Sequence, residues 1–376
     1  MLTQGGTRMP EKLRVGIIGA GMIAQDGHIP AYRKLGKEVE IAAICAGHES
    51  SARAAAEKYK IPHWFTSAEE MLSTCSLDLV SICTPNMRHA ADAALALQYG
   101  ANVLCEKPLA LTLKEAEDLF ALAAEKGLML EACQTLRFNA EYIAARGSVL
   151  DGSLGKVSFG DCTCVRRRGA PMRGAFLSSR LNGGGAFADI GVHFIDAILW
   201  IMGSPRILAV SGLSSANIIH GEKGIQYSAK DSGAYGGTVS VSADAESCDV
   251  EEFASGLIRL EGDASINFCI AWNANMPAMR SIRVLGDKSG LVLPELTYYG
   301  TGNGRMTDTK PTVFPLNQYA DMPFPGHCYL IENAVAHLLR GEALIVKPEE
   351  TLNVTAALEL FYRSCAEGRE VFRSEL

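Results

Sequence analysis

Apolar and polar positions follow two different patterns along the chain, and the change between them falls near residue 135. In the first part, short apolar runs of strand length alternate with longer stretches whose apolar residues recur at helical spacing. Pro30 breaks or kinks the first of these helices, because it lacks a backbone N–H. Strand–helix alternation predicts a parallel, doubly wound sheet. The expected strands are residues 13–19, 39–45, 79–83, 102–105 and 128–133, and the expected helices are 22–35, 50–59, 89–99 and 112–125.

The second part alternates polar and apolar residues one by one, with Gly, Asp and Asn turns between the runs. This pattern is typical of an antiparallel sheet with one face in water. At 376 residues the chain exceeds one ordinary hydrophobic core, so we expect two domains, residues 11–134 and 135–376. The expected strands are 156–167, 206–214, 253–260, 264–272 and 281–285, with helices at 139–150, 188–202, 329–339 and 350–364.

Composition excludes several classes of function. The chain has 35 basic and 42 acidic residues, a net charge of −7, so nucleic acid is not an expected partner. The most apolar stretch, 192–202, is shorter than the roughly 20 residues that span a bilayer, so we expect no membrane association. The 11 cysteines contain no C-x-x-C pair, which favours reduced thiols in the cytoplasm. The eight scattered histidines predict no metal site.

A glycine motif follows the first expected strand. Gly19, Gly21 and Ala24 form a G-x-G-x-x-A element between a strand and a helix. Gly19 permits the tight turn, Gly21 lets the backbone approach a pyrophosphate, and Ala24 allows close helix–strand packing. The alternative is a plain turn. The motif predicts that residues 11–134 form a dinucleotide-binding Rossmann domain. With the alternating pattern of the second part, the expected fold class is α/β, a doubly wound parallel sheet followed by a C-terminal α/β domain with a mostly antiparallel open sheet.

The end of the second strand bears on the choice of cofactor. NAD enzymes place an acid there to hold the ribose 2′-hydroxyl, whereas this chain has Ala46. Without that carboxylate a 2′-phosphate is not repelled, and nearby amide, hydroxyl and cationic groups can bind it. We therefore expect NADP. The alternative is NAD, with the residues after Ala46 serving only to cap the next helix. Glu49 argues mildly for NAD, because its carboxylate would repel a 2′-phosphate. The groups in question are Gly47, His48, Ser50, Ser51 and Arg53.

Three further groups of residues suggest chemistry. Thr84-Pro85-Asn86 and Glu106-Lys107-Pro108 each follow a strand, at the sheet edge where open α/β sheets bind ligands. The alternative for Lys107 is a solvated lysine beside a rigid turn. Asp189 and His193 lie four residues apart on an expected helix, so they share a face, where a carboxylate can orient an imidazole that acts as a base. The alternative there is a capping aspartate and a structural histidine.

These motifs in this order resemble the glucose–fructose oxidoreductase, inositol dehydrogenase and MocA (Gfo/Idh/MocA) family. The resemblance also covers Arg137-Phe138 and the closing Tyr362-Arg363-Ser364. It implies a nicotinamide-dependent oxidoreductase acting on a sugar, sugar derivative or cyclitol, assembled as a homodimer or homotetramer. The cofactor-binding residues expected on these grounds are Gly19, Gly21, Met22, Ile23, Ala46, Gly47, His48, Ser51, Thr84, Pro85, Asn86, His89, Glu106, Lys107 and Gln134.

The resemblance also implies roles at the reacting carbon. His193 takes or returns the hydroxyl proton, Lys107 hydrogen-bonds the reacting oxygen, and Asp189 holds substrate or His193. Arg166 and Arg168 lie at the end of the first expected strand of the second domain, where they share one face, and are further candidates for binding substrate oxygens, with a solvated strand end as the alternative. Two other functions stay open: a tightly held cofactor used as a redox shuttle in a glycosidase- or epimerase-like reaction, and a non-catalytic dinucleotide sensor.

Overall fold

The chain forms two compact units in a computed structural model that describes residues 12–172, 175–221, 226–228, 238–240 and 248–376. The first unit contains Met1–Leu109, Glu115–Thr135 and Asn317–Pro348, and the second contains Ala110–Lys114, Leu136–Leu316 and Glu349–Leu376. The chain passes to the second unit at Leu136, close to the boundary expected after residue 134. The expectation that all of 135–376 is one domain needs correction, because residues 317–348 return to the first unit.

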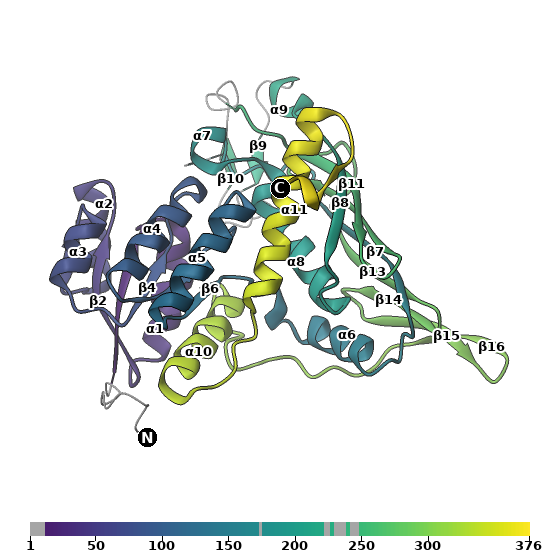
Figure 1. Cartoon of the computed structure of the whole chain (residues 1–376), viewed down its shortest axis with the longest axis horizontal. Coiled ribbons are helices and arrows are strands. Elements are labelled where there is room, and N and C mark those ends of the chain that lie inside the picture. Colours follow the sequence, from purple (N-terminus) through teal and green to yellow (C-terminus); the bar gives the residue numbers. More distant parts are fainter. Residues whose placement is uncertain (1–11, 173–174, 222–225, 229–237, 241–247) are drawn as a thin grey trace. The chain divides into compact units, whose positions relative to one another are not determined.

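The first unit is built on a six-stranded parallel sheet with the order β3-β2-β1-β4-β5-β6. This is the doubly wound Rossmann order, so the expected fold class is confirmed. Figure 1 labels β2, β4 and β6 of this sheet. Short β3 and the helix that follows it, α3 (Ala68–Thr74), were not predicted. The strands are β1 (Leu13–Ile18), β2 (Val39–Cys45), β3 (His63–Phe65), β4 (Leu79–Ile82), β5 (Asn102–Cys105) and β6 (Leu130–Ala132).

The first helical stretch changes from α to π geometry just before Pro30, which was expected to break or kink it, and the backbone stays helical at Pro30 itself. Residues Ala24–His28 form a π turn, η1, and Pro30 lies in the first turn of α1 (Ile29–Lys34). Helix α10 packs on both elements, which is why the segment 317–348 belongs to this unit. The remaining helices of the unit are α2 (Glu49–Tyr59), α4 (Asn86–Gln98), α5 (Leu113–Lys126), which begins in the second unit, and α10 (Pro325–Arg340).

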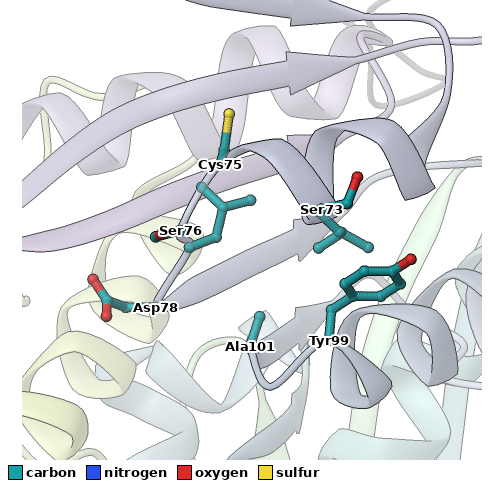
Figure 2. Close-up of a pocket in the computed structure, with 8 residues that line it drawn as sticks. Ser73, Cys75, Ser76, Asp78, Tyr99 and Ala101 are labelled. Carbon is teal, nitrogen blue, oxygen red and sulfur yellow. The ribbon is translucent and has the colours of Figure 1, made fainter.

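A pocket of about 310 Å³ opens in the first unit beside α3 (Figure 2). Its lining includes Cys75, Asp78, Tyr99 and Ala101. Asp78 and Ala101 directly precede β4 and β5, so the pocket lies at the amino edge of the sheet. Doubly wound sheets bind their ligands at the opposite, carboxyl edge. The pocket is therefore separate from the residues that the motifs single out.

The second unit is built on a nine-stranded sheet with the order β16-β15-β14-β13-β7-β12-β11-β8-β17. Only the pair β7 and β12 is parallel in this sheet, so the expected mostly antiparallel open sheet is confirmed. The strands are β7 (Val157–Val165), β8 (Ile207–Ser215), β11 (Phe253–Leu260), β12 (Ala264–Ala271), β13 (Met279–Gly286), β14 (Ser289–Leu293), β15 (Thr297–Gly302), β16 (Arg305–Thr309) and β17 (Val371–Phe372); β9 (Gln226–Ser228) and β10 (Thr238–Ser240) form a separate hairpin.

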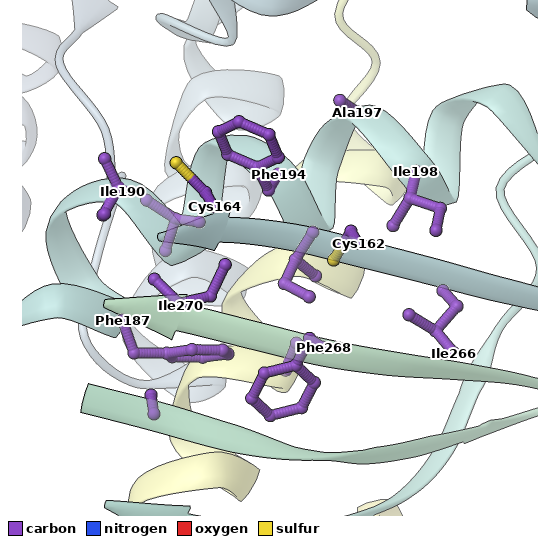
Figure 3. Close-up of a cluster of buried hydrophobic side chains, with 14 of the residues drawn as sticks. Cys162, Cys164, Phe187, Ile190, Phe194, Ala197, Ile198, Ile266, Phe268 and Ile270 are labelled. Atoms are coloured by element: carbon purple, nitrogen blue, oxygen red, sulfur yellow. The ribbon is translucent and has the colours of Figure 1, made fainter. Parts of the chain in front are cut away.

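Helix α8 lies on the sheet of the second unit (Figure 3), and nearly all of its side chains are buried. Phe187 stacks on Phe361 with 4.0 Å between ring centroids, and Phe268 adds a tilted contact at 5.1 Å. Among the described residues, the stretch Ser179–Ile201 is long and apolar enough to cross a membrane, but 94% of its most apolar window is buried in the unit, as in a core helix. The helical elements are η2 (Thr135–Phe138), which begins in the first unit, α6 (Ala140–Leu150), α7 (Ser179–Asn182), η3 (Phe187–Gly191), α8 (Val192–Ile201), α9 (Asn217–Gly221), α11 (Pro348–Glu367) and η5 (Arg373–Glu375).

Candidate functional site

The glycine turn after β1 has the geometry that a dinucleotide pyrophosphate requires. Gly19 has φ +103°, and a Cβ added there would lie 2.4 Å from the Cys83 carbonyl oxygen. At Gly21 an added Cβ would meet nothing within 4 Å, so the backbone at this position faces open space. Met22 and Ile23 begin the helix whose amino end follows the turn. An accessible backbone at a helix N-terminus is the arrangement that binds phosphate groups, so the residues present fit the cofactor.

The end of β2 carries no carboxylate at the position of Ala46. Ala46 is 9% exposed, and its N–H donates to the Phe65 carbonyl oxygen at 3.1 Å. His48 stands at the N-cap of α2 without a side-chain capping hydrogen bond. Gly47, His48 and Ser51 are exposed, so a ligand at the end of β2 could reach them. Arg53, a candidate cation here, donates to Glu57 Oε1 at 2.8 Å.

Sequence reasoning missed a second cation near the end of β2. Arg88 Nη2 donates to Asp92 Oδ1 at 2.5 Å, and Thr84 Oγ1 donates to Asp92 Oδ2 at 2.9 Å. The Arg88 side chain is 63% exposed, whereas that of Asp92 is 1% exposed. Burial raises the pKa of Cys45, Asp92 adds to the rise and Arg88 opposes it, with a net pKa of about 11, so both charges act at the last residue of β2. The available signal was an Arg and an Asp four residues apart on the predicted helix.

His89 joins the two turns at the carboxyl ends of β4 and β5. Its Nδ1 lies 2.7 Å from the Pro108 carbonyl oxygen and its Nε2 lies 2.8 Å from the Thr84 carbonyl oxygen. Burial lowers the pKa of His89 although both carbonyl groups raise it. Asn86 begins α4 directly after the first turn, and Gln134, after β6, is 2% exposed. Both turns are therefore fixed within the first unit.

Lys107 is half-buried in the turn after β5, and the residue before it is part of a buried polar cluster. Glu106 Oε1 lies 3.0 Å from His28 Nε2 and 2.9 Å from His327 Nε2. Among the residues that the structure describes, this is the group whose ligand-type atoms, all within 4.8 Å of one another, could hold a metal ion. The expectation of no metal site stays a prediction. Sequence reasoning missed His28 and His327, which are 299 positions apart in the chain (327 − 28).

Asp189 and His193 lie in the second unit, on two successive helical elements. Asp189 is inside the π turn η3, and His193 is in the first turn of α8; both side chains are half-buried. Trp272 Nε1 donates to Asp189 Oδ2 at 3.0 Å, a contact that the sequence did not indicate. The π turn also changes the geometry, because it widens the helix at the point where four-residue spacing was used to place both side chains on one face.

A buried carboxylate supports the glycine run before Asp189. Glu251 accepts hydrogen bonds from the Phe187 N–H at 2.9 Å, the Gly185 N–H at 2.8 Å and the Tyr362 hydroxyl at 2.9 Å. Burial raises the pKa of Glu251, and these three donors oppose the rise. Tyr362, which belongs to the closing motif of the resemblance, therefore holds the turn that carries Asp189.

The arginine triplet lies just beyond β7, which ends at Val165 and not at residue 167 as expected. Arg166 is 8% exposed and donates to the Gly169 carbonyl oxygen at 3.2 Å. Arg168 is half-buried and donates to the Ala274 carbonyl oxygen at 3.1 Å and to Asn275 Oδ1 at 2.7 Å, whereas Arg167 is exposed. Arg166 and Arg168 thus brace their own loop. Both belong to the second unit, whereas Lys107 belongs to the first.

Arg137, another residue of the resemblance, has a structural environment. Its Nη2 donates to Asp196 Oδ1 at 2.6 Å, and its Nη1 pairs with Glu350. All three side chains are at most 5% exposed. The guanidinium also lies over the Trp200 ring, 5.7 Å from its centroid. These contacts tie α8 and α11 together inside the second unit.

Comparison with known proteins places both units. Residues 13–133 match the model of an oxidoreductase family with an NAD-binding Rossmann fold, and residues 142–292 match the GFO/IDH/MocA C-terminal domain. D-glucoside 3-dehydrogenase of Escherichia coli is 29% identical over 96% of this chain and 97% of its own. The scyllo-inositol 2-dehydrogenase (NADP(+)) of Bacillus subtilis is 24% identical over 97% of each chain. A levoglucosan dehydrogenase solved with NADH and L-sorbose shares the fold, with a TM-score of 0.77 at 18% identity, over 96% of this chain and 99% of that one. This chain belongs to the Gfo/Idh/MocA family of nicotinamide-dependent oxidoreductases.

Proposed function

We propose that this oxidoreductase transfers a hydride between NADP and a carbinol or carbonyl carbon of a sugar, sugar derivative or cyclitol. The observation that carries the proposal is the end-to-end likeness to two relatives named as a D-glucoside 3-dehydrogenase and a scyllo-inositol 2-dehydrogenase. Each likeness spans the cofactor turn and the residues around Asp189 and His193. Substrates of both relatives carry several hydroxyl groups, which suits a site with Lys, His and Asp side chains.

Residues of this chain transfer the proton and bind the oxygen atoms of the substrate. In the oxidative direction, His193 takes the proton from the reacting hydroxyl while the same carbon loses a hydride, so the carbon is oxidised by two electrons. Lys107 donates a hydrogen bond to the reacting oxygen and stabilises its developing negative charge. Asp189 holds His193 or a substrate hydroxyl, and Arg166 and Arg168 bind further substrate oxygens. A nicotinamide cofactor held at the glycine turn of Gly19 and Gly21 would supply the hydride acceptor in this direction and the hydride donor in the reductive direction.

The choice of NADP over NAD rests on charge at the end of β2. Ala46 contributes no carboxylate that would repel a 2′-phosphate, and Gly47, His48 and Ser51 are exposed there. Arg88 adds a cation whose charge acts on Cys45, although Asp92 offsets part of it. The Bacillus subtilis relative is named for NADP(+), whereas the levoglucosan dehydrogenase was solved with NADH. In this chain, Ala46 and Arg88 favour NADP.

The test is a panel of polyols, inositols and aldoses offered with NADP and with NAD, read by absorbance of the reduced nicotinamide. The proposal expects reduced cofactor to accumulate with at least one sugar or cyclitol and faster with NADP. Turnover of a glycoside or epimer without released reduced cofactor would instead favour the redox-shuttle alternative. Cofactor binding with no turnover on any member of the panel would favour the dinucleotide sensor. Assembly as a homodimer or homotetramer and a cytoplasmic location stay predictions.

A further inference from the structure

A chain of buried hydrogen bonds runs below the turn that carries Lys107. Tyr32 OH lies 2.7 Å from Ser81 Oγ, which lies 3.0 Å from His28 Nδ1. His28 Nε2 lies 3.0 Å from Glu106 Oε1. Because Ser81 engages one ring nitrogen of His28, it fixes the orientation with which the other nitrogen faces the carboxylate. The imidazole of His28 is fully buried, so its position is set by these contacts and by packing.

A second imidazole reaches the same carboxylate oxygen from a distant part of the chain. His327 Nε2 lies 2.9 Å from Glu106 Oε1, and His327 is 7% exposed. His327 lies in the first turn of α10. This helix packs on η1, the π turn that ends with His28. A Cβ added at Gly27 would lie 3.6 Å from the His327 ring, so the two elements approach closely. The segment 317–348 therefore places His327 at the carboxyl edge of the parallel sheet, beside Glu106.

The other oxygen of Glu106 faces the backbone of the next residue. The Lys107 N–H donates to Glu106 Oε2 at 3.3 Å. The far side of the turn is held as well, because His89 Nδ1 lies 2.7 Å from the Pro108 carbonyl oxygen. Three buried imidazoles thus fix the residues on both sides of Lys107. Burial alone would raise the pKa of Glu106, but His327 and His28 lower it well below its usual range, so the carboxylate is ionised and accepts from both rings.

A fold requirement alone does not account for this cluster. Replacing a buried ionic group by packed apolar side chains is often neutral or stabilising in proteins. What the polar cluster provides is a rigid position for one backbone segment, the segment that carries the amine of Lys107. Residues that orient a reacting group in this way act through a supporting shell of hydrogen bonds.

We infer that His28 and His327 are positioning residues that clamp Glu106 and thereby fix Lys107 for its contact with the reacting oxygen. This inference rests on the proposed role of Lys107. We expect the clamp to affect catalysis more than cofactor affinity, because its hydrogen bonds end at the Lys107 turn, whereas the pyrophosphate is proposed to bind at the glycine turn after β1. Misplacing a catalytic group by about 1 Å can lower the rate roughly 100-fold.

The test compares His327→Phe, which keeps a ring but removes the donor, with His327→Gln, whose amide nitrogen can replace Nε2. The matched control is His337→Phe, on the same helix ten positions later (337 − 327), where Nδ1 lies near the Glu342 carbonyl oxygen. We expect His327→Phe to lower kcat by roughly 10- to 100-fold with KM changed less than about threefold, and His327→Gln to restore most of it. The control should stay within about twofold of wild type. Nicotinamide affinity, measured by fluorescence titration, should change less than about threefold in all three.

Two further measurements separate positioning from general damage. In a Lys107→Ala background, His327→Phe should cause no additional loss of kcat, because both changes remove the same contribution. Without cofactor, acetylation of Lys107 by acetic anhydride, followed by mass spectrometry, should be several-fold faster in His327→Phe than in wild type or His327→Gln, because the turn is freed. Additive losses of kcat, or equal labelling in all variants, would overturn the inference.

The outcomes also separate the inference from the proposed function. If Lys107→Ala alone leaves kcat unchanged, the role of Lys107 fails and the inference fails with it. If Lys107→Ala lowers kcat but His327→Phe does not, only the inference fails. A stoichiometric metal found by elemental analysis in the wild type and lost in His327→Phe would also overturn it, because the imidazoles would then be ligands and not hydrogen-bond donors.

Discussion

The carboxylate of Glu251 lies 2.8 Å from the Gly185 backbone nitrogen, and a Cβ added at Gly185 would lie only 1.9 Å from the Glu251 carbonyl oxygen. The two backbones therefore approach as closely as a residue without a side chain permits. This contact sets the position of the π turn that carries Asp189. It explains why the run Gly183–Gly185 precedes the helix with Asp189 and His193: at Gly185 the run gives close approach rather than flexibility.

Replacing Gly185 should therefore damage the second unit. We expect Gly185→Ala to lower the free energy of unfolding by roughly 1–3 kcal/mol or more, because backbone atoms must move apart to admit the methyl group. The comparison is Gly147→Ala in α6, where an added Cβ meets nothing within 4 Å. That variant should be more stable than wild type by roughly 0.5–1 kcal/mol, because Ala favours a helix over Gly. Urea unfolding of both proteins tests the pair, and a Gly185→Ala protein as stable as wild type contradicts the assignment.

The two glycines after β1 should separate folding from cofactor binding. Gly21→Ala should fold with an unchanged melting temperature, because the methyl group has open space, yet bind NADP at least 10-fold more weakly, since that space admits the pyrophosphate. Gly19→Ala should lose stability instead, because its Cβ would lie 2.4 Å from the Cys83 carbonyl oxygen at a φ of +103°. Thermal unfolding and fluorescence titration of both variants give the answer. Normal NADP affinity in Gly21→Ala would show that the pyrophosphate lies elsewhere.

Much of the fold was predictable because long elements carry a clear period. Strand β11 lies where alternation placed it, and the strands β1, β2, β4 and β5 lie within one residue or so of their expected ends. Short or exposed strands gave no such signal. β3 has three residues, two of them exposed, and every residue of β16 is exposed, so neither shows an alternation of buried and exposed positions.

The candidate site was only partly predictable for a different reason. Local motifs singled out Gly19, Lys107 and the Asp189–His193 pair as candidates, because each motif depends on neighbours within a few residues. His327 and Trp272 reach their partners across more than 80 residues, and one sequence carries no record of such contacts. The same limit explains the domain correction, since periodicity predicted helix α10 but not the unit on which it packs.

Ala46 should decide between the two dinucleotides. We expect Ala46→Asp to reverse the preference from NADP to NAD, because a carboxylate at the end of β2 repels a 2′-phosphate and accepts a hydrogen bond from a 2′-hydroxyl. The neutral control is Ala46→Asn, which adds a similar volume without the charge. Titration of both cofactors with all three proteins is the measurement. Tighter NAD binding by the wild type would contradict the preference from the start.

The buried ion pair in the second unit should be far more sensitive than an exposed one. Arg137→Met leaves the carboxylate of Asp196 buried without its guanidinium partner, so we expect a loss of roughly 3–5 kcal/mol in the free energy of unfolding. Arg283→Met removes an exposed pair with Asp161 and should cost less than about 1 kcal/mol. Adding Asp196→Leu to Arg137→Met should recover part of the loss, because the unpaired charge of Asp196 is then removed, while Glu350 still has Arg146 Nη2 at 3.6 Å. Equal effects of the two arginine variants in urea unfolding would be inconsistent with this account.

Acid should weaken the first unit through His28 before it does so through Glu106. Burial lowers the pKa of His28 below its ordinary 6.5, so the unfolded chain binds a proton there that the folded chain does not. The free energy of unfolding therefore falls as the pH drops below about 6.5, by ~1.4 kcal/mol for each unit of pKa difference. The pKa of Glu106 is held well below its ordinary 4.5, so its contribution is present above pH 4.5 and is lost as the pH falls further. In His28→Gln the first of these losses should disappear, because the amide does not titrate, while the second remains.

Urea unfolding of wild type and His28→Gln at pH 8, 6.5, 5.5 and 4 measures both losses. At pH 8 neither protein is protonated at this position, so the difference between the two proteins there isolates any change in packing. A wild-type curve that stays flat from pH 8 to 5.5, or one that His28→Gln leaves unaltered, would show that His28 is not held neutral by burial.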